Sequence, residues 1–248
     1  EQLKTREPSN TAVDKKLAEI YYLKNDFSKA AEAYSRFAMG PTATEEDLVK
    51  YAFALFLNHD FEKSLEVANM GLKKNARHAA FNRLTMYNYT DLKRFDEAIK
   101  AADAFFTESD KADYSYLDYM YYGHLLEALK KYDEAVEQYE KAIQLDPTKT
   151  DLYKNISSAY EQKNDYKKAI SAYQKYYASL DKEKQTPDLQ FQFGRLYYGA
   201  GTQPDSLAIT VEERKQALMS ADSTFHAIAE AAPDSYLGNF WRARANSA

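Results

Sequence analysis

Hydrophobic and polar residues follow helical spacing in pairs of short segments along most of this chain. The clearest pair spans residues 116–149, with one amphipathic segment from Tyr116 to Leu129 and another from Asp133 to Leu145. The charged turn 130–132 joins the two segments, and Asp146-Pro147 ends the second. Apolar positions recurring every three or four residues, bounded by turn residues, predict two antiparallel helices.

This helix pair recurs along the chain at nearly constant intervals. The first small residue of each second helix sets the register, and these residues lie 34, 34, 37, 34 and 52 positions apart: Ala30, Ser64, Ala98, Ala135, Ala169 and Ala221. The first five follow an aromatic residue by three positions: Phe27, Phe61, Phe95, Tyr132 and Tyr166. A fixed period of this length is typical of a repeat protein, in which helix pairs stack on one another.

The best-preserved repeat, residues 116–149, resembles the tetratricopeptide repeat (TPR) family. It has a small residue, Gly123, in its first helix, Ala135 and Tyr139 four positions apart in its second, and Pro147 after it. The resemblance implies an all-α fold, a right-handed superhelix (α-solenoid) of about six and a half helix hairpins. We expect one array over residues 1–248, with repeats near 11–44, 45–78, 79–112, 116–149, 150–183 and 187–234, then a lone first helix over 236–248.

Some positions depart from the family pattern. The 52-residue interval indicates an insertion near residues 199–215, where Gly199, Gly201 and Pro204 predict an irregular excursion before a long second helix. The position seven after the register residue is small in the family, but here Phe37, Phe105 and other large side chains occupy it. Large side chains at that position predict irregular stacking of neighbouring hairpins.

The last predicted helix keeps Phe240 and Trp241 on a partly apolar face. A capping helix of a repeat array has a polar outer face. We therefore expect the natural chain to continue past Ala248 rather than end there.

Composition and charge narrow the classes of partner. The 248 residues include 45% hydrophobic and 29% charged residues, no cysteine and no apolar run long enough to span a bilayer, so we expect no membrane insertion in this segment. A net charge of -5 without a Lys/Arg stripe argues against nucleic acid as a partner. The absence of cysteine excludes disulfides and thiolate metal sites and leaves cytosol and periplasm both open.

The first residue of the chain, its composition and its repeats bear on its cellular compartment. The chain begins at Glu1 rather than Met, which suggests removal of an export signal or an expression boundary. The composition and the repeats are typical of bacterial proteins, and we favour the periplasm or cell envelope over the cytoplasm.

No catalytic constellation is recognisable. The four histidines are not spaced as metal ligands, and no nucleophile elbow, P-loop or dinucleotide-binding glycine fingerprint occurs. Carboxylates on the helices are followed by Lys at i+4, as with Glu137 and Lys141, which is the pattern of a solvated helix face. We therefore expect no enzyme activity, no cofactor and no metal.

The resemblance also implies which residues face a partner. TPR proteins line their concave groove with the second, fifth, ninth and twelfth positions of each first helix. Those positions carry the candidate groove residues Lys15, Glu19, Tyr22, Val49, Phe53, Phe56, Arg83, Tyr87, Leu117, Met120, His124, Lys154, Ser158, Phe191, Arg195 and Tyr198. Aromatic residues, Met and Arg are enriched in protein interfaces, so the set predicts a protein or peptide ligand, although some rings could instead fold over the neighbouring helix.

Within this set, Phe53, Phe56 and Tyr87 form the candidate hot spot, and the insertion 199–210 is a second candidate surface. The carboxylate clamp of co-chaperone TPR domains is not matched, because Glu19 and Ser158 stand where that clamp has Asn. The favoured function is a non-enzymatic protein–protein interaction scaffold. Two alternatives remain: a structural component that self-associates through its C-terminal end, and a small-ligand carrier or enzyme with a pocket near His124.

Overall fold

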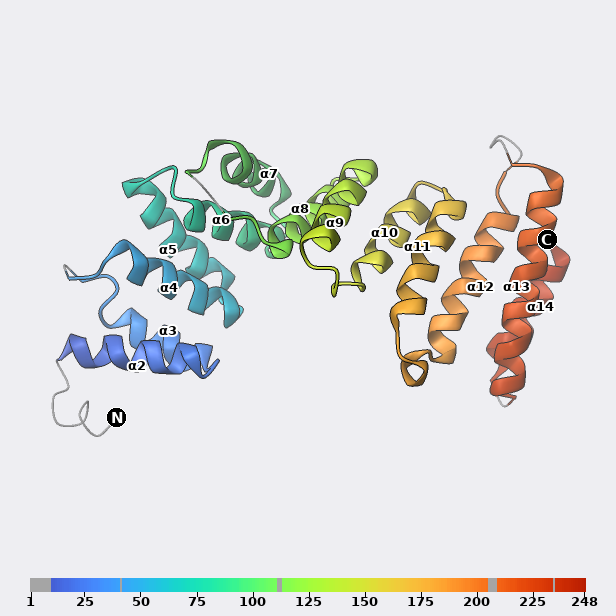
Figure 1. The fold of residues 1–248 in the computed structure, drawn as a ribbon, viewed down its shortest axis with the longest axis horizontal. Helices are drawn as coiled ribbons and strands as arrows, with labels where there is room; N and C mark the ends of the chain where they lie inside the picture. The colour runs from blue at the N-terminus through green and yellow to red at the C-terminus, as the bar shows by residue number, and fades with distance from the viewer. Residues whose placement is uncertain (1–9, 41, 111–112, 205–208, 234) are drawn as a thin grey trace. The chain divides into compact units, whose positions relative to one another are not determined.

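The computed structural model describes residues 10–40, 42–110, 113–204, 209–233 and 235–248 of the chain. These residues form thirteen α-helices, one π-helical segment and one short 3-10 helix, with no strand among them. The chain divides into two compact units, unit 1 (Glu1–Leu129) and unit 2 (Lys130–Ala248) (Figure 1). The all-α expectation is therefore confirmed, whereas a single array over the whole chain stays a prediction.

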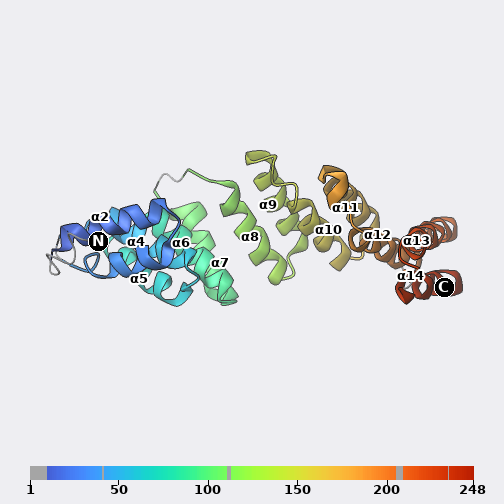
Figure 2. The same ribbon diagram turned by 90° about the horizontal axis from the view of Figure 1, so that it is seen from below.

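The described residues of unit 1 form three helix pairs and one further helix, which can be followed in Figures 1 and 2. The pairs are α2 (Thr11–Leu23) with α3 (Phe27–Ser35), α4 (Glu45–Leu57) with α5 (Phe61–Lys74), and α6 (Ala79–Asp91) with α7 (Phe95–Asp103), followed by α8 (Tyr116–Ala128). Each helix packs on the next along the chain, and the first helices α4, α6 and α8 also contact one another in that order. The first helices of unit 1 therefore lie side by side.

Unit 2 follows the same plan of sequential packing. Its helices are α9 (Tyr132–Leu145), α10 (Leu152–Gln162), α11 (Tyr166–Ser179), α12 (Pro187–Gly201), α13 (Val211–Ala231) and α14 (Tyr236–Ser247). Each of these helices packs on its successor. The 3-10 helix Lys182–Lys184 lies in the connection between α11 and α12.

The turn inside each repeat explains the register seen in the sequence. Within the described part of the chain, five residues other than glycine adopt left-handed backbone with φ between 57° and 60°: Asn25, His59, Lys93, Lys130 and Asn164. Each precedes a register residue by five positions, and Ala30, Ser64, Ala98, Ala135 and Ala169 are all fully buried. A left-handed residue after a helix lets the next amide bond back to a carbonyl of the last turn, as Asp60 N–H does to Leu55 at 2.9 Å. The register residues therefore occupy equivalent places in successive repeats.

Helix starts are set by local caps. Asn10 accepts a hydrogen bond from the Ala12 amide at the start of α2. Complete capping boxes begin three later helices, with Thr44 and Asp47 at α4, Ser115 and Asp118 at α8, and Thr210 and Glu213 at α13. Each box satisfies backbone amides that the first turn leaves without a partner.

A large ring at a normally small position is accommodated locally in unit 1. Phe105 lies in the π-helical segment Ala104–Glu108, which follows α7 directly. The wider turn holds a fully buried ring, which packs among the residues of α6 and α7 and under the guanidinium of Arg83 at 5.1 Å. A single π turn therefore fits a large side chain where the repeat pattern has a small one.

The expected excursion from residue 199 is wrong at its beginning. Helix α12 continues through Gly199 to Gly201, and residues 205–208 lie outside the described part of the chain. Both glycines serve close packing: a Cβ on Gly199 would fall 2.3 Å from the Tyr166 ring, and one on Gly201 would fall 2.5 Å from Leu218. From the sequence alone these glycines are interpreted as helix breakers, because the sequence does not show that Tyr166 and Leu218 pack against them.

The second helix of the first repeat is shorter than expected. The sequence predicts it to extend to about Met39, but α3 ends at Ser35 and hydrogen-bonded turns continue from there. Phe37 and Ala38 stay buried in those turns, so the apolar pattern persists where the α-helix does not.

Candidate partner-binding surface

Three aromatic rings from three first helices meet in unit 1, and we call Phe56, Tyr87 and Tyr121 the aromatic cluster. Tyr87 stacks on Tyr121 with ring centroids 4.1 Å apart, and Phe56 lies 5.6 Å from Tyr87 and 6.1 Å from Tyr121. The rings of Phe56 and Tyr121 are partly exposed, whereas Tyr87 is only 3% exposed. Two of the three rings therefore reach solvent, with Tyr87 beneath them.

A buried carboxylate holds Tyr87, the buried ring of the aromatic cluster, in place. Asp118 is fully buried, and it accepts hydrogen bonds from Arg83 Nε at 2.7 Å and from the Tyr87 hydroxyl at 2.7 Å. The Arg83 Nη2 and the Ser115 amide complete its shell at 3.1 and 2.7 Å. A buried charge is tolerated when it is paired and hydrogen-bonded in this way, so α6 and α8 are joined through one carboxyl group.

This geometry changes the roles of two predicted groove residues. Tyr87 does not offer its ring to a partner, and the Arg83 guanidinium is occupied by Asp118. Tyr121, which sequence reasoning missed, takes the exposed place beside Phe56, and its hydroxyl donates to Asp91 at 3.0 Å. The S-x-x-D pattern at 115–118 was a signal for Asp118, whereas no sequence signal separates Tyr121 from the other tyrosines.

Helices α2 and α4 repeat the arrangement in a simpler form. Asp47 is 3% exposed; Lys15 of α2 lies 2.8 Å from its carboxylate and Thr44 donates to it. Burial by itself would raise the pKa of Asp47, but the hydrogen bonds from Lys15 and Thr44 outweigh it and hold the pKa below its ordinary value. Lys15, like Arg83, is a predicted groove cation that ties one first helix to the next.

The other predicted residues of unit 1 lie around this core. Glu19 pairs with Lys16 at 2.9 Å, and the Tyr22 ring packs 5.6 Å from Phe27. Val49 and Phe53 are half-buried against the core of the first two repeats. On α8, Leu117 is exposed while Met120 and His124 are partly exposed.

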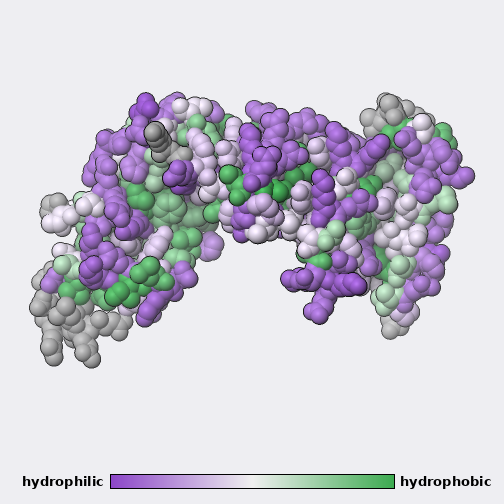
Figure 3. Space-filling model, in the orientation of Figure 1, coloured by the Kyte–Doolittle hydropathy of each residue, from purple (hydrophilic) through white to green (hydrophobic). Residues whose placement is uncertain are grey.

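Figure 3 shows where apolar residues reach the surface on one face of the molecule. In unit 1, hydrophobic patches interrupt the hydrophilic surface around α4 and α6 and over α2. Ile20 and Leu23 are the exposed large hydrophobic residues of α2, with exposed fractions of 47% and 83%. Apolar residues therefore reach solvent on the helices that carry the predicted groove positions.

The predicted residues of unit 2 divide into cations and packed rings. Lys154 lies over the Tyr176 ring at 5.4 Å, and Arg195 lies 3.6 Å from Glu161. Phe191 and Tyr198 pack edge-on against Trp241 at 5.7 and 5.4 Å, and both are partly buried. Ser158 is partly exposed on α10. Here the rings join α12 to α14.

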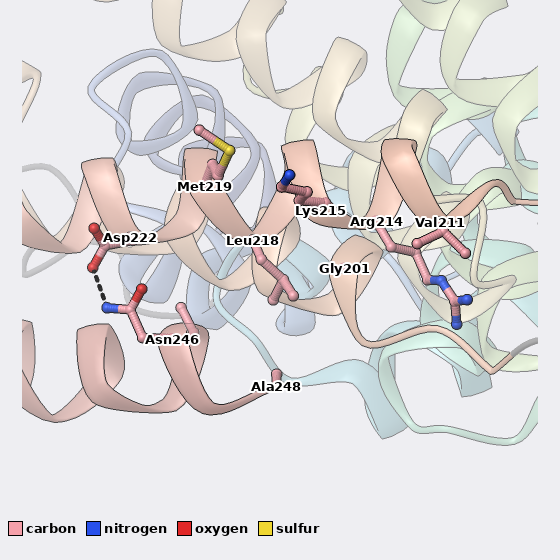
Figure 4. Close-up of a pocket in the computed structure, with 10 residues that line it drawn as sticks. Gly201, Val211, Arg214, Lys215, Leu218, Met219, Asp222, Asn246 and Ala248 are labelled. Atoms are coloured by element: carbon pink, nitrogen blue, oxygen red, sulfur yellow. Dashed lines mark hydrogen bonds between the residues drawn. The ribbon is translucent and has the colours of Figure 1, made fainter.

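A cleft of about 680 Å³ lies near the second candidate surface, at the C-terminal part of unit 2 (Figure 4). Leu218 points from α13 toward Ala248 at the end of α14, while Met219 projects from the other side of α13 in this view. Two of its charged groups already have partners, since Asp222 accepts from Asn246 at 3.0 Å and Arg214 donates to the Gln203 carbonyl at 3.3 Å. The cleft therefore combines apolar side chains with Lys215 and with polar groups that are already paired.

The described residues show no metal-binding arrangement. Among them, no group of three or more His, Asp or Glu side chains is placed to hold a metal ion. Within the described residues, no helix has both the length and the apolar character that crossing a bilayer requires.

Comparison with known families decides what this arrangement is. A TPR repeat model matches residues 123–164, and a tetratricopeptide repeat model matches residues 152–187. Residues 123–187 carry tetratricopeptide repeats. No curated protein matches the sequence, so the assignment rests on these repeats and on the fold.

Several solved structures share the fold of this TPR protein. The C-terminal part of a TPR repeat-containing protein from Cytophaga hutchinsonii is 26% identical, with a TM-score of 0.61 over 80% of this chain and 70% of that one. MamA from Desulfovibrio magneticus, residues 41 to the end, is 16% identical, with a TM-score of 0.60 over 71% and 97%. PilF from Pseudomonas aeruginosa is 14% identical, with a TM-score of 0.61 over 97% and 100%.

The family suggests the class of function. TPR repeats are generally non-enzymatic scaffolds, and their fold suggests protein partners. The family by itself identifies neither the partner nor the surface that binds it.

Proposed function

We propose that this TPR protein binds a protein or peptide partner on the first helices of unit 1, with Phe53, Phe56 and Tyr121 as the apolar anchors. The observation that carries the proposal is the partly exposed pair Phe56 and Tyr121, which packs on buried Tyr87, itself hydrogen-bonded to buried Asp118. Phe53 lies one helical turn before Phe56 and presents its ring on the same side of α4.

Rigid support favours binding at this place. A side chain that is already ordered loses little rotamer entropy when a partner covers it, so more of the buried apolar area contributes to affinity. Hot spots in protein interfaces are typically aromatic side chains near the centre of the contact. The Tyr87–Asp118 hydrogen bond and the stacking of Tyr121 supply that order here.

The charges of unit 1 indicate how the partner is recognised. Lys15 and Arg83 are paired with Asp47 and Asp118 inside the unit, so they do not serve as free cations toward a ligand. We therefore expect recognition that depends mainly on apolar contacts and changes little with salt concentration.

The test uses the chain as immobilised bait in an extract of its source cells, with retained proteins quantified by mass spectrometry. Phe53→Ala together with Phe56→Ala should reduce retention of the partner by at least about tenfold, as expected for hot-spot anchors. The matched control is Tyr236→Ala with Phe240→Ala, which removes two exposed rings from unit 2.

Circular dichroism and thermal melting separate loss of binding from loss of fold. Equal retention by a folded Phe53 and Phe56 double variant would refute the proposal. Equal loss in the control variant would also refute it, because unit 1 would then have no special part in binding.

The groove positions predicted in unit 2 give a separate candidate surface. Lys154 and Arg195 are exposed, and Ser158 lies between them in the repeat order. Phe191 and Tyr198 support α14 and contribute only their outer edges.

Self-association is the second candidate function, and the exposed face of α14 favours it. Tyr236, Leu237 and Phe240 are 75%, 41% and 49% exposed, whereas Trp241 is packed against Phe191. We expect Phe240→Ala, and not a change at Trp241, to report on association without disturbing the core. Sedimentation velocity over a hundredfold range of concentration tests it, and a strictly monomeric wild-type chain would refute it.

A further inference from the structure

A second cleft in unit 2, of about 170 Å³, has a composition unlike the first-helix surfaces described above. Tyr153 and Tyr160 of α10 line one side, and Lys168, Ser171 and Lys175 of α11 line the other, with Glu140 of α9 at the edge. None of these six residues is a predicted groove position. The cleft is therefore a separate surface from the one proposed for unit 1.

The two lysines and the two tyrosines are paired in a regular way. The Lys168 Nζ lies 5.2 Å from the centre of the Tyr160 ring, and the Lys175 Nζ lies 5.4 Å from the centre of the Tyr153 ring. Each pair of like residues is seven positions apart on its helix, which is close to two turns. The ammonium groups are thus steadied by ring faces, a contact that orders a cation without neutralising it.

The cations of this cleft lie on a helix without acidic residues. Helix α11 carries Lys167, Lys168 and Lys175 and no Asp or Glu, in a chain whose net charge is -5. Lys168 pairs with Asp165 at 3.2 Å, just before the helix, and also feels the charge of Asp133. Among the described residues, no carboxylate lies within ion-pair distance of Lys175. Glu140 is the one acidic residue in the lining of the cleft.

The spacing of the cations indicates the form of a ligand. Seven residues along a helix span roughly 10 Å at 1.5 Å per residue. Three residues of an extended segment in the polyproline II conformation span about 9 Å and complete one turn, so their side chains return to the same face. Acidic side chains three positions apart in such a segment would therefore meet both ammonium groups, with the Ser171 hydroxyl between them as a hydrogen-bond donor.

We propose that this cleft on α10 and α11 binds an acidic, extended segment of a protein partner through Lys168, Lys175 and Ser171. Tyr153 and Tyr160 hold the two ammonium groups in place by stacking. Glu140 opposes the ligand electrostatically and limits the affinity. This site works independently of the apolar surface of unit 1.

The probe is a fluorescein-labelled peptide of five Glu-Gly-Gly repeats, and the reference peptide has Gln in place of Glu. Fluorescence anisotropy of the full chain should show binding of the Glu peptide at least about tenfold tighter than of the Gln peptide at low salt, with a strong loss at high salt. Equal binding of the two peptides, or no binding of the Glu peptide, would overturn the proposal.

Variants localise the effect. Lys168→Glu with Lys175→Glu should weaken binding by about tenfold or more, while Lys182→Glu with Lys184→Glu, the same charge change in the 3-10 helix, should stay within about twofold. Lys175→Glu alone leaves the Asp165 ion pair intact and should still weaken binding several-fold. Equal losses at the two pairs of lysines would mean nonspecific attraction and would overturn the proposal.

Glu140→Gln supplies a test that a damaged fold cannot imitate, because we expect it to tighten binding by about twofold or more. Unchanged or weaker binding in a folded Glu140→Gln variant contradicts the proposal. A twelve-residue oligothymidylate and vesicles with 30% phosphatidylserine complete the comparison. Tighter binding of either through the same two lysines would replace the acidic peptide with a phosphate-bearing partner.

Discussion

Successive helix pairs are held together by different interactions in unit 1 and in unit 2. In unit 1, buried Asp47 and Asp118 each complete a capping box and receive a cation from the preceding first helix. In unit 2, Trp241 packs on Phe191 and Tyr198, and exposed ion pairs such as Arg195 with Glu161 link neighbours. The comparison teaches that a repeat position does not determine a role: the cations of unit 1 are used inside the fold, whereas lysines of unit 2 stay on its surface.

The largest expected effect tests the buried carboxylate. Asp118→Ala should lower the free energy of unfolding by about 3 to 5 kcal/mol, because it leaves the Arg83 charge and the Tyr87 hydroxyl without their partner. Asp222→Ala in unit 2 is the control, since Asp222 is partly exposed where Arg242 and Asn246 reach it, and about 1 kcal/mol or less should be lost. Urea denaturation followed by circular dichroism measures both. Similar losses in the two variants would remove the distinction between the units.

The next effect tests close packing in both units with the same substitution. A Cβ on Gly71 would fall 2.2 Å from the Phe81 ring, and a Cβ on Gly194 would fall 2.4 Å from the Phe225 ring. Gly→Ala in a helix ordinarily adds up to about 1 kcal/mol of stability. We expect Gly71→Ala and Gly194→Ala to lose about 1 to 3 kcal/mol instead, because both rings are fully buried. A gain of melting temperature in either variant would show that the ring can move aside.

A smaller effect depends on pH and concerns Asp47. Its folded pKa lies below the ordinary value, so its stabilising contribution is complete above the ordinary pKa and is lost as the pH falls through the folded pKa. Asp47→Asn should cost about 1 to 2 kcal/mol near neutral pH through the weakened bonds to Lys15 and Thr44. The difference from wild type should shrink between pH 5 and pH 2. A constant difference across that range would mean that the charge on Asp47 is unimportant.

The smallest expected effect sharpens the description of unit 2. Glu161→Gln removes the 3.6 Å pair with Arg195, whose side chain is 42% exposed. The free energy of unfolding should change by less than about 1 kcal/mol, and less still in high salt. A larger loss of unfolding free energy, measured by calorimetry, would mean that this pair stabilises the fold in the way that Asp118 and Arg83 do.

The sequence by itself determined the fold class and the repeat register. Apolar spacing, the left-handed turn and the capping boxes at Thr44, Ser115 and Thr210 depend on residues within one or two helical turns, so they can be read from neighbouring letters. The long helix from Val211 was predictable for that reason. The same local reasoning failed at Gly199, where the cause is the ring of Tyr166, more than thirty residues away.

Which aromatic and charged residues reach solvent depends on how the helices pack on one another, and this is visible in the tertiary structure alone. Tyr87 and Tyr121 are both tyrosines on first helices, yet one is buried on Asp118 and the other is partly exposed beside Phe56. Arg83 is likewise occupied by a carboxylate 35 positions further along the chain. Whether a side chain is buried or paired depends on the helix of the neighbouring repeat that packs against it. Side chains that look equivalent in the sequence therefore differ in exposure.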